Sequence, residues 1–226
     1  MTVQEIVTRV RSAIDELMAN DSQFLSVSSD EINLDKVIVD KISYALQYII
    51  ENAPIDKLGN SMLSTLTSQE LQSLFSIDVE TLVGRLQLPS DMLRIVEARL
   101  SSWSLFPIPE PDTSQVYLMQ QDTYARGSWD RPVNILTYTA GHQVLEMYCA
   151  KTASDELMFV YVKKPSGSYS ISNPTATVDV PAKLEAALIY QVAGLSMVAF
   201  REDVSASLFA IAAQHMGIKP ENEETP

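Results

Sequence analysis

The chain has 226 residues, 46% of them hydrophobic, which is enough apolar material for one large domain or two small ones. Its formal net charge is −13, which argues against tight wrapping of DNA because phosphates are gripped by Lys and Arg. The single cysteine, Cys149, excludes an internal disulfide and a thiolate metal cluster, and no apolar run approaches the roughly 18–20 residues of a membrane span.

Two helices are predicted near the N-terminus. The first follows a capping box at Thr2 and Glu5 and ends near Asn20, and the second covers residues 34–51, with Asp30 or Asn33 as its cap. A polar loop over 21–30 separates them, and residues 55–79 fit only short helical turns and loops. The apolar positions at helical spacing are Val3, Ile6, Val7, Val10, Ile14, Leu17 and Met18 in the first helix, and Leu34, Val37, Ile38, Ile42, Ala45, Leu46, Ile49 and Ile50 in the second.

From about residue 80 the hydrophobic period changes from 3.6 to 2. In "LVGRLQL" (82–88), Leu86 and its alternate neighbours form an apolar face, while Arg85 and Gln87 form the polar face of a half-buried strand. The next stretch, "LPSDMLRIVEARLSSW" (88–103), has the long side chains of a helix. However, a turn at Pro89 followed by a strand fits its alternation better.

A sheet region is predicted to continue to about residue 180. Three prolines make 106–115 a stiff, exposed connection, and further strands are predicted at 116–121, 134–139, 143–149, 157–163 and 168–172. Turns at Gly141, Ser154–Asp155 and Pro165–Gly167 separate several of them. These spacings are of hairpin length, so we expect the strands to be antiparallel.

The C-terminal part returns to helical spacing. Pro181 suits a first helical turn. Residues 184–200 carry a broad apolar band, and their small residues allow another backbone to approach closely. A last helix is predicted to end at Gly217. The expected fold class is α+β. Its parts are an N-terminal helical region (1–80), a central antiparallel β region (81–180), a C-terminal helical hairpin (181–217) packing with the N-terminal helices, and a disordered acidic tail (218–226).

The sequence predicts no enzyme site. His142 follows a hairpin turn and His215 lies on the last helix, so neither has a nucleophile and an orienting group beside it in the sequence. Two isolated histidines lack metal-ligand spacing, and Cys149 is interpreted as a small apolar filler in a strand. We therefore expect no catalytic residue, no metal, no cofactor and no small-molecule substrate.

The segment "YARGSWDRPV" (124–133) places Arg126, Trp129 and Arg131 in a loop between strands of an otherwise acidic chain. Exposed Trp and Arg are the residues that most often anchor protein interfaces. A purely structural interpretation is equally open, in which Trp129 folds back onto the sheet and the arginines pair with nearby acids.

Several stretches together resemble one family. Leu88, Pro89, Asp91, Leu93, Arg94 and Val96 followed by Trp103 resemble the middle of head-to-tail connector proteins of short-tailed phages, the adaptor or tail-tubular ring proteins beneath the portal. The continuation "VYLMQQDTYARGSWDRPV", then "VLEMYCAK", is similar to the ring proteins of crAss-like phages. The resemblance extends over most of residues 34–217, includes the two C-terminal helices, and is weakest over 55–79.

The resemblance implies a virion structural protein of the tail or neck, assembled in the host cytoplasm into a ring of usually twelve copies through which the genome is ejected. Its partners would be the portal and other ring or tail proteins. DNA would pass along an acidic wall without being bound specifically, and the protein would not contact a membrane. The expected interface residues are Trp103, Arg126, Trp129 and Arg131. Two other classes stay open: a small intracellular enzyme with an unrecognised site, and a protein-binding adaptor that does not self-assemble.

Overall fold

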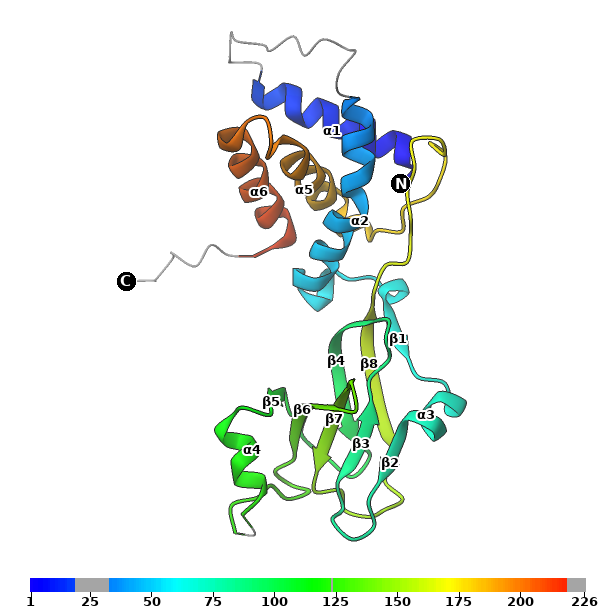
Figure 1. The fold of residues 1–226 in the computed structure, drawn as a ribbon, viewed down its shortest axis with the longest axis vertical. Coiled ribbons are helices and arrows are strands. Elements are labelled where there is room, and N and C mark those ends of the chain that lie inside the picture. The colour runs from blue at the N-terminus through cyan, green and yellow to red at the C-terminus, as the bar shows by residue number, and fades with distance from the viewer. Residues whose placement is uncertain (19–32, 123, 219–226) are drawn as a thin grey trace, which may run out of the picture. The chain divides into compact units, whose positions relative to one another are not determined.

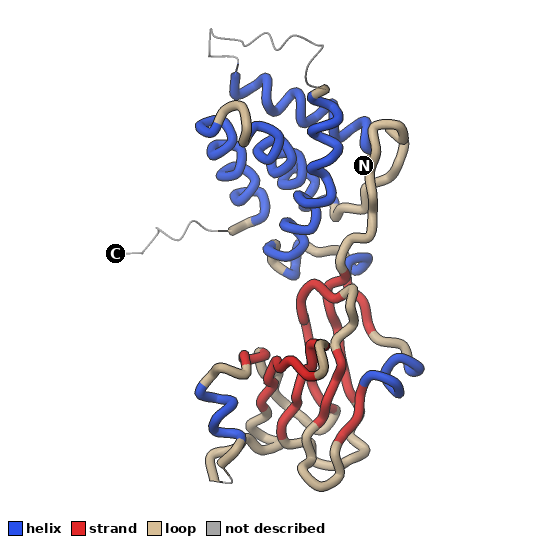
Figure 2. The backbone as a smooth tube through the Cα atoms, in the orientation of Figure 1, coloured by secondary structure: helices blue, strands red, loops and turns tan. Residues whose placement is uncertain are grey.

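The computed structural model describes residues 1–18, 33–122 and 124–218 of the chain, which forms two compact units (Figure 1). The first, here named the helical unit, joins Met1–Ser61 to Lys164–Pro226, so the two ends of the sequence share one core. The second, named the β unit, is the continuous stretch Met62–Lys163. Figure 2 shows helices dominating the first unit and strands the second.

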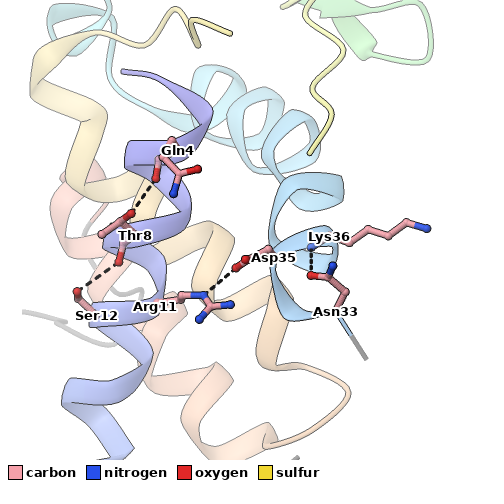
Figure 3. Close-up of polar contacts among 7 residues, drawn as sticks. All are labelled: Gln4, Thr8, Arg11, Ser12, Asn33, Asp35 and Lys36. Atoms are coloured by element: carbon pink, nitrogen blue, oxygen red, sulfur yellow. Dashed lines mark hydrogen bonds and ion pairs between the residues drawn. The ribbon is translucent and has the colours of Figure 1, made fainter. Parts of the chain in front are cut away.

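The two N-terminal helices are α1, Val3–Met18, and α2, Leu34–Asn52, as predicted. The capping box is present at α1, where the Thr2 backbone N–H donates to Glu5 (2.8 Å) and the Glu5 N–H donates to Thr2 Oγ1 (3.2 Å). Asn33 caps α2 by accepting the Lys36 N–H at 3.2 Å (Figure 3). Most of the predicted apolar residues are buried, whereas Leu34 and Val37 are half-buried and Leu17 is 37% exposed; the side chain of Met18 lies outside the description.

The C-terminal hairpin consists of α5, Glu185–Met197, and α6, Glu202–Met216. Helix α5 contacts α1, α2 and α6, so it is buried on most sides, and Leu188 and Val192 are fully buried. Gly194 lies against the Phe209 ring, where a Cβ would meet the ring at 2.6 Å. The small residues of 184–200 therefore serve close packing inside this unit. Gly217 ends α6 in the left-handed conformation (φ 80°), where glycine is favoured.

The β unit contains two sheets. The three-stranded sheet has the order β1 (Leu63–Thr65), β8 (Leu157–Lys163), β4 (Met92–Leu100), and the five-stranded sheet has the order β2 (Phe75–Ile77), β3 (Gly84–Gln87), β7 (His142–Tyr148), β6 (Val133–Thr139), β5 (Pro109–Pro111). All pairs are antiparallel except β5 with β6, which are parallel. The expected α+β class, with a largely antiparallel central region, is therefore confirmed.

The core of the β unit lies along the strands predicted from alternation. Strand β3 alternates buried and exposed residues, and the stretch beginning at Met92 is a strand, as the sequence favoured. Trp103, which follows β4, is 2% exposed. The buried members of this core are Leu66, Leu86, Leu88, Ala98, Leu100, Trp103, Leu145, Met147, Ala150, Leu157, Phe159 and Tyr161.

Three secondary-structure predictions are wrong. Residues 116–121 lie mostly in helix α4, Gln115–Gln120, because the Ser114 hydroxyl caps its first turn by accepting the Tyr117 N–H at 3.3 Å. Residues 168–172 form no strand, since Ser170 accepts the Ser172 N–H at 3.3 Å and bends the chain. The proline-rich connection contains β5, an edge strand where Pro109 and Pro111 need no ladder N–H.

The ambiguous stretch 55–79 contains more than turns. Short 3-10 turns occupy Ile55–Lys57 and Asn60–Met62, another lies at Ala182–Leu184, and helix α3 covers Ser68–Leu74. Strands β1 and β2 were missed because three residues are too few to show a period. The predicted loop over 21–30 and nearly all of the tail lie outside the described residues. Within the described ranges, no helix has both the length and the apolar character needed to cross a membrane.

Candidate protein interface

The segment 124–131, here named the Trp129 loop, connects α4 to β6. Ser128 and Arg131 exchange two backbone hydrogen bonds, at 3.2 and 2.8 Å, which close the tip of the loop. The Gly127 N–H donates to the side chain of Gln120 at 2.9 Å, and Gln120 itself is buried. A Cβ on Gly127 would lie 2.7 Å from the Arg131 carbonyl oxygen, so glycine is required by this close approach.

Cys149 joins the loop to the core. It follows β7 with a left-handed backbone (φ 71°), and its buried thiol donates to the Gly127 carbonyl. Its own carbonyl accepts the Trp103 indole N–H at 3.1 Å. Cys149 is therefore a buried small residue, as expected, but its polar contacts with Gly127, Arg126 and Trp103 also join the loop to the core.

Trp129 is 47% exposed, so its ring is neither fully solvated nor folded away into the sheet. The Lys151 ammonium lies over this ring, 4.7 Å from the centroid, in a cation–π contact. Arg126 is exposed and donates to the Thr81 carbonyl at 3.2 Å, and Arg131 is exposed as well. We name the set Arg126, Trp129, Arg131 and Lys151 the Trp129 surface.

The nearby carboxylates are engaged by hydrogen-bond donors. Asp130 accepts from the Ser128 hydroxyl, and this hydrogen bond lowers the pKa of the Asp130 carboxyl. Asp155 accepts the Lys151 backbone N–H at 2.8 Å and the Ser102 hydroxyl at 2.5 Å. Burial alone raises the Asp155 pKa, but hydrogen bonds from Ser102 and Thr152 outweigh burial and lower it. Both groups are therefore held in the charged form, and the charge of Arg131 also helps to lower the pKa of Asp130.

The structure separates the four predicted interface residues. Arg126, Trp129 and Arg131 lie together on one exposed loop, whereas Trp103 belongs to the core and supports that loop through Cys149. Lys151 was missed. The β6–β7 hairpin could have indicated it. Because Val133 pairs with Tyr148, the Trp129 loop, which precedes β6, lies beside the residues that follow β7, and Lys151 is among these.

Further large apolar side chains are exposed in the segment before β5 and on α4. Phe106 is 62% exposed, Ile108 81% and Leu118 62%, and Tyr124 of the Trp129 loop is 99% exposed. The guanidinium of Arg99 covers the Phe106 ring, 4.8 Å from its centroid. These exposed side chains lie within one stretch of the sequence, 106–124, and a contiguous apolar surface built from them would suit a binding partner.

The two histidines lie in different units: His142 is in the β unit and His215 in the helical unit. His142 is the exposed first residue of β7, and the His215 ring stacks on Tyr190 with centroids 5.4 Å apart. Over residues 1–18, 33–122 and 124–218, no three His, Cys, Asp or Glu side chains gather in a way that could hold a metal ion.

Comparison of the sequence with models of known protein families gave no match, and comparison with curated proteins gave no significant one.

Proposed function

We propose that this protein is a structural ring component of the head-to-tail connector of a short-tailed phage, placed below the portal and acting through its outer surfaces. The observation that carries the proposal is the concentration of exposed anchor residues in the β unit, from Phe106 and Ile108 to Trp129. Aromatic and long apolar side chains at a protein surface contribute most when they are desolvated by a partner. The sequence resemblance supplies the kind of partner: copies of the same chain and the portal.

Charge supports the passage of DNA without binding. A wall of net negative charge repels phosphates, so a duplex can slide past it instead of being held. The chain as a whole carries −13, and residues 1–80 hold 13 acidic against 5 basic side chains. In this proposal the acidic surface lets the genome pass, while the exposed apolar side chains hold the ring together.

The test is assembly of the purified full chain with and without the portal protein. We expect sedimentation velocity and negative-stain images to reveal rings, or ring growth on the portal where the chain alone stays monomeric. Absence of any ring on the portal would overturn the proposal. Binding to the portal without self-assembly would instead support the adaptor class.

A pair of matched variants locates the contact. Phe106→Ser with Ile108→Ser removes two exposed apolar side chains, so ring growth should be lost while the circular dichroism spectrum is kept. Val79→Ser is the control, since Val79 is 75% exposed in the same unit but lies in the turn between β2 and β3. If the double variant and the Val79→Ser control formed rings equally well, a contact through Phe106 and Ile108 would be contradicted.

A further inference from the structure

We propose that the Trp129 surface is the cationic half of a contact between copies, and that its occupant is the acidic helical unit of a second copy. This inference rests on the proposed ring function and specifies which surfaces meet. Such a contact joins two different patches, so repeating it from copy to copy generates a ring or a filament.

The first argument is where the cations gather. The β unit carries 7 basic and 12 acidic side chains, and three of the seven lie at the Trp129 surface. Within the described part of the chain, no ion pair involves Arg126, Arg131 or Lys151. By contrast, three other cations of the same unit are paired at 3.1, 2.8 and 3.1 Å: Arg85 with Glu146, Arg99 with Glu97, and Lys163 with Asp91.

The second argument is the complementary charge of the helical unit. Its described residues hold 11 acidic and 8 basic side chains. Several of its exposed carboxylates make no ion pair with any described residue: Asp15, Glu16, Asp40, Asp56, Asp179 and Glu202. A cationic patch that lacks ion pairs on one copy and an acidic unit with such carboxylates on the next are complementary in charge.

The third argument is that the Trp129 surface is held in place before any partner binds. The loop is fixed by the Ser128–Arg131 hydrogen bonds, by Gln120 and by the Cys149 thiol, and Lys151 already lies over the Trp129 ring. A prearranged surface loses little conformational entropy on docking, so its contacts contribute more fully to affinity. Trp129 is the apolar anchor, Lys151 lies over its ring, and Arg126 and Arg131 belong to the same loop.

An aromatic ring among cations also suits single-stranded nucleic acid, whose bases stack on aromatic side chains. The net charge of −13 repels a long polyanion from the chain as a whole, whereas a second copy presents its carboxylates on a folded surface. We therefore favour the second copy and treat single-stranded DNA as an alternative outcome of the test.

The test maps contacts of the full chain with a photo-crosslinking amino acid at Tyr124, which is 99% exposed in the Trp129 loop. Mixing ¹⁵N-labelled and unlabelled chains separates links between copies from links within one copy. We expect links between copies to end in residues 1–61 or 164–226. The same probe at Tyr138, 74% exposed in the same unit, should give few of these links.

A charge reversal tests the electrostatic part. Arg131→Glu with Lys151→Glu should weaken self-association at least about tenfold in sedimentation, and added salt should weaken the native association as well. Lys36→Glu with Lys164→Glu is the control, since it changes net charge equally at exposed positions of the helical unit. It should leave association unchanged or stronger.

The contact is overturned if the reversed chain associates as well as the native one. It is also overturned if links between copies are absent, end within 62–163, or are replaced by links to added single-stranded DNA. Rings that still grow on the portal in those cases leave the proposed function standing without this contact. Failure of the native chain to form any ring on the portal removes the proposed function itself.

Discussion

The helical unit and the Trp129 loop are held in place by different kinds of contact. In the helical unit, side chains three and four residues apart form apolar stripes that pack around α5, whose Leu188 and Val192 are fully buried. The Trp129 loop is held by polar contacts from Gln120, which shortly precedes it, and from Thr81 and Cys149, which are more distant in sequence. A repeated apolar pattern therefore fixes a fold, whereas individual long-range hydrogen bonds shape a surface.

The largest expected effect separates the two tryptophans. Trp103→Ala should lower the free energy of unfolding of the β unit by about 3–5 kcal/mol, because it opens a cavity in the core and removes the donor to Cys149. Trp129→Ala, at a half-exposed position, should cost less than about 1 kcal/mol. Denaturation in urea, followed by circular dichroism, measures both. Similar losses would end the distinction between core and surface.

A second test concerns packing in the helical unit. Gly194→Ala should destabilise the unit by about 1–3 kcal/mol, because the new Cβ meets the Phe209 ring at 2.6 Å and the close packing of α5 with α6 must open. Gly59→Ala is the matched control, since its Cβ would meet only the Ser61 hydroxyl oxygen at 3.6 Å. Thermal unfolding of the two variants checks the difference, and equal midpoints would contradict it.

A smaller effect is expected where the helical unit depends on one polar contact. Asn33→Ala removes the acceptor for the Lys36 N–H and should cost about 1 kcal/mol. Asn33→Asp keeps an acceptor oxygen at the cap and should restore most of the loss. Hydrogen exchange of the first-turn amides of α2 reports this directly. Unchanged exchange in the alanine variant would show that the cap contributes nothing.

The smallest effect is a pH dependence beside the Trp129 surface. The pKa of Asp155 is lowered in the folded chain, so its contribution to stability is present above the unfolded value and is lost as pH falls through the folded one. Acidification below about pH 4 should therefore raise acrylamide quenching of the exposed tryptophan, Trp129, before the chain unfolds. In Asp155→Asn this early change should be absent; an unaltered profile would assign it to another group.

Much of the fold could be predicted because its signals are local. The helices over 3–18 and 34–52, the strands β3, β4, β6, β7 and β8, and the C-terminal hairpin follow from spacing that neighbouring residues display. The errors occur where a side chain binds the backbone nearby, as Ser114 and Ser170 do, or where a strand has three residues. In those places a single hydrogen bond or a distant partner strand outweighs the weak local preference.

The candidate interface divides in the same way. Arg126, Trp129 and Arg131 were visible in the sequence because an exposed loop concentrates them within six residues. The placing of Lys151 over Trp129 and the burial of Trp103 beneath the loop were not visible, because both depend on how β6 and β7 pair and on which side chains the core encloses. Composition and periodicity determined the class of fold. Only the tertiary structure decided which of the interface side chains share a surface. The reason is that contacts between distant segments are set by how whole helices and strands pack, and not by the order of residues within them.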